Sequence, residues 1–197
     1  MSALGGIFAR LPRWTLYAGA ATIQIALLAL MVYDRATILR EGREIRLQTR
    51  PVDPRDFLRG DYVQLRYDMS NLPAGALKGE PAGDRRVYVR LAPDADGFYR
   101  ALSVHRTPIA VTAPDVLIAG RVQSGATCSE GRHHFCDNLA IHYGIERYFV
   151  PQGEGREIES ARNQGKVTIV AAVTPSGRAA IKRLMIDGKA VYDEPLF

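Results

Sequence analysis

The chain of 197 residues contains few of the patterns that identify a chemical activity. It has no internal repeat, no low-complexity tract and no spacing of catalytic groups that rises above background. Its only cysteines are Cys128 and Cys136, and it lacks the Cys-x2-Cys knuckle typical of zinc sites. The net charge is +5, but the basic residues are not clustered with aromatic ones, which gives nucleic-acid binding little support. The sequence therefore predicts no cofactor, no metal and no catalytic residues, and favours a non-enzymatic role.

Charge is also absent from the run between Trp14 and Tyr33. Apart from the aromatic residues near both ends, its polar side chains are Thr15, Thr22 and Gln24. About 20 apolar residues are enough for a helix to cross the ~30 Å hydrocarbon core of a bilayer, and aromatic rings prefer its interfaces. The run is therefore predicted to be a transmembrane helix, in preference to a buried core helix.

A cleaved signal peptide is the stronger alternative, because Arg10 and Arg13 supply a basic segment before the apolar run. The exit from Leu30 to Arg35 offers no small-x-small cleavage site, and the run is longer than the usual 7–15 apolar residues of a signal peptide. These features favour an uncleaved signal anchor.

Two arguments disagree on orientation. More arginines follow the span than precede it, which favours a cytoplasmic C-terminal side. The pair Cys128 and Cys136, close together in one loop, instead fits a disulfide formed outside the cytoplasm. A long C-terminal domain also translocates largely regardless of charge. We expect the C-terminal domain to lie outside the cytoplasm.

The expected domain organisation has three parts: an N-terminal tail at 1–13, a transmembrane anchor helix at 14–40 and a β-rich domain at 43–197. Alternation at Ile45, Leu47 and Thr49, and again at Val63, Leu65 and Tyr67, is typical of half-buried strands. Further short apolar runs lie at 87–91, 98–104, 116–122, 145–150, 167–173 and 179–186. The predicted fold class is mostly β, a β-rich α+β protein with an antiparallel, barrel-like sheet.

Short sequence patterns predict hairpins, a helix and a loop at specific places. The turns at Thr174–Gly177 and Asp187–Gly188 each predict a hairpin, because their Pro and Gly residues suit the required backbone angles. The segment from Gly155 to Asn163 is predicted as one short amphipathic helix, followed by Gly165. Pro73 to Gly83, rich in Pro, Gly and Ala, is predicted as an exposed loop.

The loop between Cys128 and Cys136 also contains His133 and His134, which are zinc-type ligands. Adjacent histidines point in divergent directions, so a loop-closing disulfide is the preferred interpretation over a metal site. His142 and Glu146 lie four residues apart in a strand-like pattern, where that spacing does not pair them.

A turn rich in Pro, Asp and Arg, between Pro51 and Asp61, leads directly into an alternating strand. Its charges either fix a tight strand entrance through bonds to nearby backbone N–H groups, or offer forked arginine donors to a carboxylate or lipid phosphate. General acid–base chemistry is the least favoured interpretation, since no partner base is identifiable. Tyr67 is assigned to the core with an internal bond for its hydroxyl, and Tyr62 to the accessible face.

These residues resemble the bacterial GDYXXLXY family, whose motif stands here as Gly60, Asp61, Tyr62, Leu65 and Tyr67. The segments Pro51–Asp56, Leu58–Arg59 and Tyr143–Pro151 are also similar to the family pattern. The resemblance implies a membrane-anchored envelope protein without established activity, often associated with multi-span membrane proteins. The residues taken as a binding surface are Asp53, Arg55, Asp56, Arg59, Asp61, Tyr62, Tyr143 and Glu146.

A fainter likeness is to the type I signal peptidases, in which a Gly-Asp pair follows a membrane anchor. No serine occurs between Ser2 and Ser70, so their nucleophile is missing at its expected place. The favoured hypothesis is an accessory or interaction module for a membrane protein partner. The alternatives are an envelope hydrolase using carboxylates of the Asp53–Asp61 turn, with His142 or Glu146, and a binder of anionic lipid or envelope polymer. The last would use juxtamembrane arginines, namely Arg35, Arg40, Arg43 and Arg46.

Overall fold

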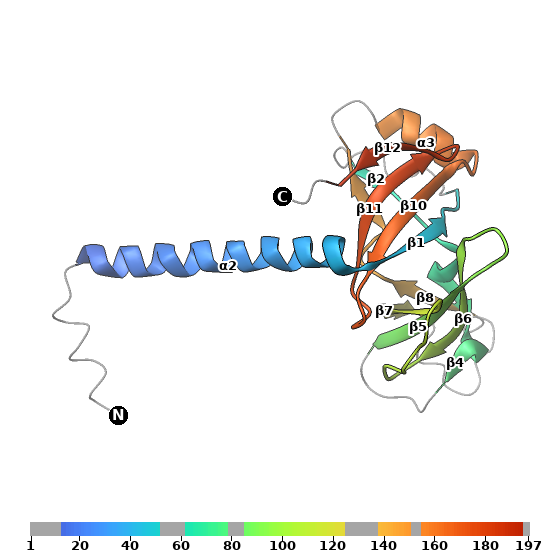
Figure 1. Cartoon of the computed structure of the whole chain (residues 1–197), viewed down its shortest axis with the longest axis horizontal. Helices are drawn as coiled ribbons and strands as arrows, with labels where there is room; N and C mark the ends of the chain where they lie inside the picture. Colours follow the sequence, from blue (N-terminus) through green and yellow to red (C-terminus); the bar gives the residue numbers. More distant parts are fainter. Residues whose placement is uncertain (1–12, 52–61, 79–84, 125–137, 151–154, 195–197) are drawn as a thin grey trace. The chain divides into compact units, whose positions relative to one another are not determined.

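The structure is a computed structural model that describes residues 13–51, 62–78, 85–124, 138–150 and 155–194. It divides into two compact units, one formed by residues 1–37 with Phe197 and the other by residues 38–196. Figure 1 shows the helices and strands along the chain. The two units are taken in turn.

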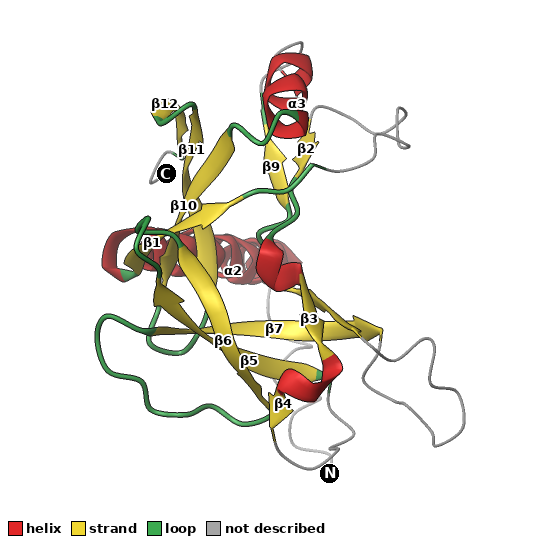
Figure 2. Cartoon of the chain, turned by 90° about the vertical axis from the view of Figure 1, so that its right-hand side faces the viewer, coloured by secondary structure: helices red, strands yellow, loops and turns green. Residues whose placement is uncertain are grey.

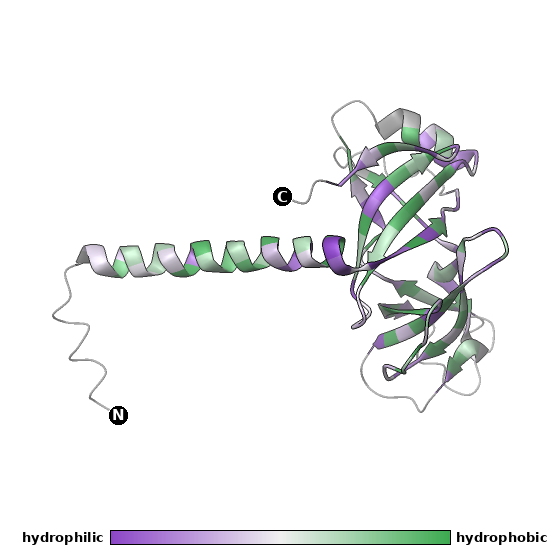
Figure 3. Ribbon diagram, in the orientation of Figure 1, coloured by the Kyte–Doolittle hydropathy of each residue, from purple (hydrophilic) through white to green (hydrophobic). Residues whose placement is uncertain are grey.

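The first unit is dominated by helix α2 (Arg13–Glu41), of which residues up to Thr37 belong to this unit. Figure 3 shows hydrophobic residues along its length. The side chains from Leu16 to Tyr33 are exposed all round, so the helix has no buried stripe of the kind that packs against a protein core. Its length and composition are sufficient to cross a membrane, as the sequence predicts.

The second unit is built almost entirely of strands, seen face-on in Figure 2. Within the described residues they form a four-stranded sheet (β1-β10-β11-β12), a pair (β2-β9) and a curved six-stranded sheet (β3-β8-β7-β5-β6-β4). Neighbouring strands described here are antiparallel except β4 and β6. The strands are β1 (Arg43–Gln48), β2 (Tyr62–Gln64), β3 (Asn71–Pro73), β4 (Leu77–Lys78), β5 (Arg86–Pro93), β6 (Tyr99–His105), β7 (Val116–Ser124), β8 (Asn138–His142), β9 (Arg147–Phe149), β10 (Val167–Val173), β11 (Ala179–Ile186) and β12 (Lys189–Asp193).

The alternating patterns place one face of each sheet in a common core. In β1, Ile45 and Leu47 are buried while their neighbours are exposed. In β5, Val87, Val89 and Leu91 are fully buried and join the same cluster. The mostly-β, barrel-like fold predicted from these alternations is confirmed.

The predictions of the two hairpins and of the short helix are confirmed. Gly177, at φ +85°, donates its N–H to Thr174 O at 2.9 Å and closes the β10–β11 hairpin. Asp187 and Gly188 both have positive φ, as a type I′ turn requires, and join β11 to β12. Helix α3 (Gly155–Asn163) has the predicted bounds, and Gly165 follows it at φ +71°.

The last turn of α2 belongs to the second unit and is fixed to its four-stranded sheet. Ile38 and Leu39 are buried against Ala172 and Ala180. Gly42 ends the helix by donating its N–H to Ile38 O at 3.0 Å. A Cβ at this position would lie 2.4 Å from Ile38 O and 2.9 Å from Ala172 Cβ, so only glycine fits here.

The prediction of a continuous exposed loop from Pro73 to Gly83 is wrong for its described part. A 3-10 helix (η2, Ala74–Ala76) and β4 occupy it, because β4 finds a parallel partner in β6. Strand β2 is also shorter than the alternation suggests: it ends at Gln64, and Tyr67 forms an isolated bridge with Thr49. A second 3-10 helix, η1 (Asp68–Ser70), follows that bridge.

Candidate functional site

Backbone contacts near the end of the GDYXXLXY motif hold together the two ends of the segment that connects β1 to β2. Arg50 N–H donates to Arg66 O at 2.7 Å, directly beside the Thr49–Tyr67 bridge. Thr49 is itself buried, and its hydroxyl donates to Val167 O at 2.6 Å. The two ends of this segment are therefore held together by the backbone and tied to β10.

Tyr67 has the role that the alternation predicts. Its ring is 2% exposed, and its hydroxyl donates to Ile145 O at 2.5 Å. Burial, and then the Glu146 carboxylate, raise the pKa of this hydroxyl well above its usual value. The group therefore stays protonated and serves as a hydrogen-bond donor inside the core.

Glu146 and Tyr143 join the motif to the loop between β8 and β9. The Glu146 carboxylate accepts the N–H groups of Tyr143 at 2.5 Å and Gly144 at 2.9 Å, where Gly144 has φ +81°. The backbone carbonyl of Glu146 accepts the N–H of Leu65 at 2.8 Å. The buried Tyr143 hydroxyl donates to Met69 O at 2.6 Å, and burial raises its pKa. These bonds give both residues a structural role, and the predicted binding role stays a prediction.

Arg162 is a further residue of this region that the binding hypothesis does not include. It lies on α3 and is only 2% exposed, and its guanidinium donates to Gln64 O at 2.7 Å and to Asn163 Oδ1 at 3.1 Å. Burial lowers its pKa. The sequence signal is an arginine on the same helical face as Ile158 and Ala161, where an aliphatic residue would be ordinary.

A small hollow in the surface of the domain is lined in part by Tyr67. Phe98 in its wall has the Arg46 guanidinium 4.9 Å from its ring centroid. Arg100 on the rim pairs with Asp94 at 2.7 Å and Asp68 at 3.6 Å, and Arg50 also pairs with Asp68. The lining residues are Leu47, Gln48, Tyr67, Asp68, Met69, Phe98, Tyr99 and Arg100.

Most of the predicted binding surface lies outside the described residues. This applies to Asp53, Arg55, Asp56, Arg59 and Asp61. Tyr62 is placed only by its backbone, which pairs with Phe149 across β2 and β9. The loop with Cys128, His133, His134 and Cys136 is likewise outside, so the disulfide stays a prediction.

The residues named for the hydrolase alternative are placed only in part. His142 is exposed at the end of β8, opposite Arg121, while the Glu146 carboxylate is bonded to backbone N–H groups. In the part of the chain that the structure describes, no three His, Cys, Asp or Glu residues gather as a metal site would require.

Together these features define a class: a strand-rich domain preceded by one helix long and apolar enough to cross a membrane. The family model of the GDYXXLXY protein matches residues 24–184, and the chain belongs to this family, whose function is unknown. No curated protein and no solved structure matches the chain.

Proposed function

We propose that the protein is a single-pass, membrane-anchored envelope protein whose β domain is a non-catalytic accessory module of a multi-span membrane protein. The observation that carries this proposal is the amide of Gln24 in the middle of α2. Family membership supports it, because the resemblance implies association with multi-span membrane proteins.

The anchor follows from the surface of α2. Its side chains between Trp14 and Tyr33 are exposed and mostly apolar on every side. Water would penalise so much exposed apolar surface at ~25 cal/mol per Å², whereas hydrocarbon does not. Twenty residues at about 1.5 Å each match the ~30 Å bilayer core, with Trp14 and Tyr33 at its two interfaces.

Gln24 lies close to the midpoint of that run. Among the described residues its side-chain amide has no hydrogen-bond partner. An amide left unpaired in hydrocarbon costs several kcal/mol, and side chains or backbone groups of a neighbouring transmembrane helix are its available partners. Thr22 provides the contrast, since its hydroxyl already donates to Ala18 O at 2.9 Å.

A non-catalytic role fits the bonds of the described motif residues. Tyr67, Tyr143 and Glu146 each use their polar atoms to hold the β2 region to the β8–β9 loop. Backbone bonds also hold the two ends of the segment between residues 50 and 66 together. Loops positioned by a scaffold commonly carry binding residues, so this segment is suited to recognition of a partner.

The test is affinity purification of the full chain from crosslinked native membranes solubilised in detergent. We expect the wild type and the matched control Thr22→Val to recover the same multi-span protein. Gln24→Leu should recover at least fivefold less of it, because one interhelical hydrogen bond contributes about 1–2 kcal/mol. Equal recovery with Gln24→Leu, or recovery of further copies of this chain alone, would contradict the proposal.

A second comparison locates the contact of the domain. Arg59→Ala/Asp61→Ala changes the turn predicted before β2 and leaves the span unchanged. We expect this variant to lose the partner while its thermal unfolding stays that of the wild type. Unaltered association would remove the turn from the contact surface.

A further inference from the structure

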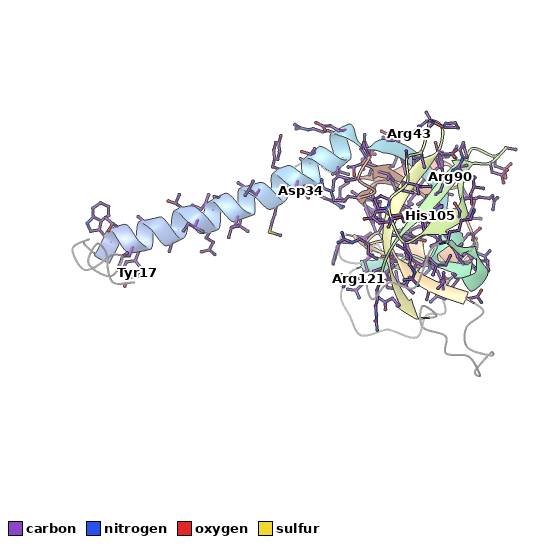
Figure 4. All side chains as sticks on the ribbon, turned by 90° about the horizontal axis from the view of Figure 1, so that it is seen from below. Tyr17, Asp34, Arg43, Arg90, His105 and Arg121 are labelled. Atoms are coloured by element: carbon purple, nitrogen blue, oxygen red, sulfur yellow. The ribbon has the colours of Figure 1, made fainter. Side chains whose placement is uncertain are left out.

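Basic side chains meet on the outward face of the six-stranded sheet. The register pairs Arg86 with Arg121 and Arg121 with His142 across β5, β7 and β8. All three are exposed, while the alternate residues of β5 face the core. One step along β5, the register pairs Tyr88 with His105 and His105 with Lys78. Figure 4 labels Arg90, His105 and Arg121 on this sheet.

Like charges directly opposite each other destabilise a sheet, so this arrangement carries a cost. Arg90 is balanced by Asp115, whose carboxylate accepts from its Nε at 2.6 Å. Within the described ranges, Lys78, Arg121 and His142 form no ion pair. Lys78 on β4 and Arg121 on β7 therefore carry positive charges that no acidic group among the described residues balances.

His105 responds to this field. Its ring bonds Ser103 Oγ at 2.8 Å, and its pKa is lowered by burial and then by the charges of Lys78 and Arg90. An anion bound to this face would offset the charges of Lys78 and Arg90 and so raise the pKa of His105. The pKa of His105 is therefore a measure of the electrostatic potential at this face.

Backbone contacts within the second unit connect this face to β1, the strand that follows α2. Ala119 N–H, on β7, donates to Gly177 O at 2.8 Å, so the β10–β11 turn touches the strand that carries Arg121. The last residue of β10, Val173, pairs with Arg43, the first strand residue after α2. Tyr88, half-buried among the charges, is a residue type that favours membrane interfaces.

We propose that this face, through Lys78, Arg121 and His142, binds the phosphates of anionic phospholipid headgroups in the leaflet from which the domain emerges. The proposal rests on the membrane anchoring proposed above. Lys78, Arg121 and His142 do not converge on a pocket, as recognition of one small anion would require, but are exposed on the outward face of the sheet, on β4, β7 and β8. Basic side chains spread over an exposed face suit the packed headgroups of a leaflet.

The test uses the full chain, purified in non-ionic detergent and titrated with dihexanoyl-phosphatidylglycerol or dihexanoyl-phosphatidylcholine. The readouts are the affinity from chemical-shift changes of Arg121 and the pKa of His105. The face variant is Lys78→Gln/Arg121→Gln, and the control variant is Arg66→Gln/Lys189→Gln, which removes equal charge elsewhere. Glycerophosphate is a third ligand.

We expect the anionic lipid to bind, to raise the pKa of His105 and to bind more weakly at high salt. Each basic side chain near an anionic surface contributes about 1 kcal/mol, so the face variant should bind roughly thirtyfold more weakly and the control within about twofold. Equal binding of phosphatidylcholine, or equal losses in both variants, would overturn the proposal. Glycerophosphate binding as tightly as the lipid would assign the face to a soluble anion instead. Because the protein is purified, none of these results depends on the Gln24 partner.

Discussion

Tyr67 shows how one side chain of the motif contributes to stability. Its hydroxyl is buried and donates to Ile145 O, which links the segment after β2 to the loop before β9. Tyr67→Phe keeps the ring and removes the donor, leaving a buried carbonyl without this bond. We expect a loss of about 1–3 kcal/mol in the free energy of unfolding, measured by urea denaturation of the detergent-solubilised chain.

Tyr88→Phe is the matched control for that substitution. The Tyr88 ring is half-buried on β5, and its hydroxyl makes no hydrogen bond within the described residues. Its change in stability should stay within about 0.5 kcal/mol. A loss at Tyr88 as large as the loss at Tyr67 would show that the buried hydrogen bond is not the cause.

The junction of α2 with β1 is the element most sensitive to added volume. Gly42→Ala places a methyl group 2.4 Å from Ile38 O and 2.9 Å from Ala172 Cβ, so the helix end or the sheet has to shift. We expect this variant to lose about 1–3 kcal/mol of unfolding free energy and several degrees of thermal midpoint. Gly75→Ala, which meets nothing within 4 Å, should be nearly neutral. Equal melting of the two variants would contradict the close contact.

The outer face of the six-stranded sheet makes stability depend on pH through His105. Because its folded-state pKa is lowered from 6.5, the folded chain favours the neutral ring more than the unfolded chain does. This contribution is complete above about pH 6.5 and is lost as the pH falls through the folded-state pKa. We expect Lys78→Gln to raise the pKa of His105 and weaken that dependence, and Lys189→Gln to leave both unchanged, as followed by histidine NMR and denaturation at several pH values. An unchanged pKa in Lys78→Gln would separate His105 from this charge.

Helices, turns and strands were predictable from the sequence where residues close together in the chain determine them. The hairpins at Thr174–Gly177 and Asp187–Gly188 depend on turn residues, and α3 depends on its own spacing and its following glycine. Strands β3, β4 and β8 were not predicted, because they are short and are defined by partners far along the chain, as in the pairing of Leu72 with Leu139. Proline and glycine near Leu77 indicate a loop unless the parallel partner β6 is known.

At the scale of the whole molecule, the long apolar helix and the buried residues of the motif were predictable from the sequence, while the hydrogen bonds of the polar residues around the motif were not. Tyr67 follows from alternation alone. The bonds of Glu146 to two backbone N–H groups require the shape of the β8–β9 loop, which no spacing encodes. The burial of Arg162 similarly depends on how α3 meets β2.

The proposed orientation of the chain leads to a prediction about its two cysteines. It places the domain outside the cytoplasm, where Cys128 and Cys136 should form a disulfide, and closing so short a loop contributes about 2–3 kcal/mol in the chain-entropy model. Peptide mapping without reductant should find the two cysteine peptides linked. In intact spheroplasts, a membrane-impermeant maleimide should label the cysteines only after an impermeant reductant is added. Labelling that needs lysis but no reductant would place the domain in the cytoplasm, where the excess of arginines after the span would then be explained by the positive-inside rule.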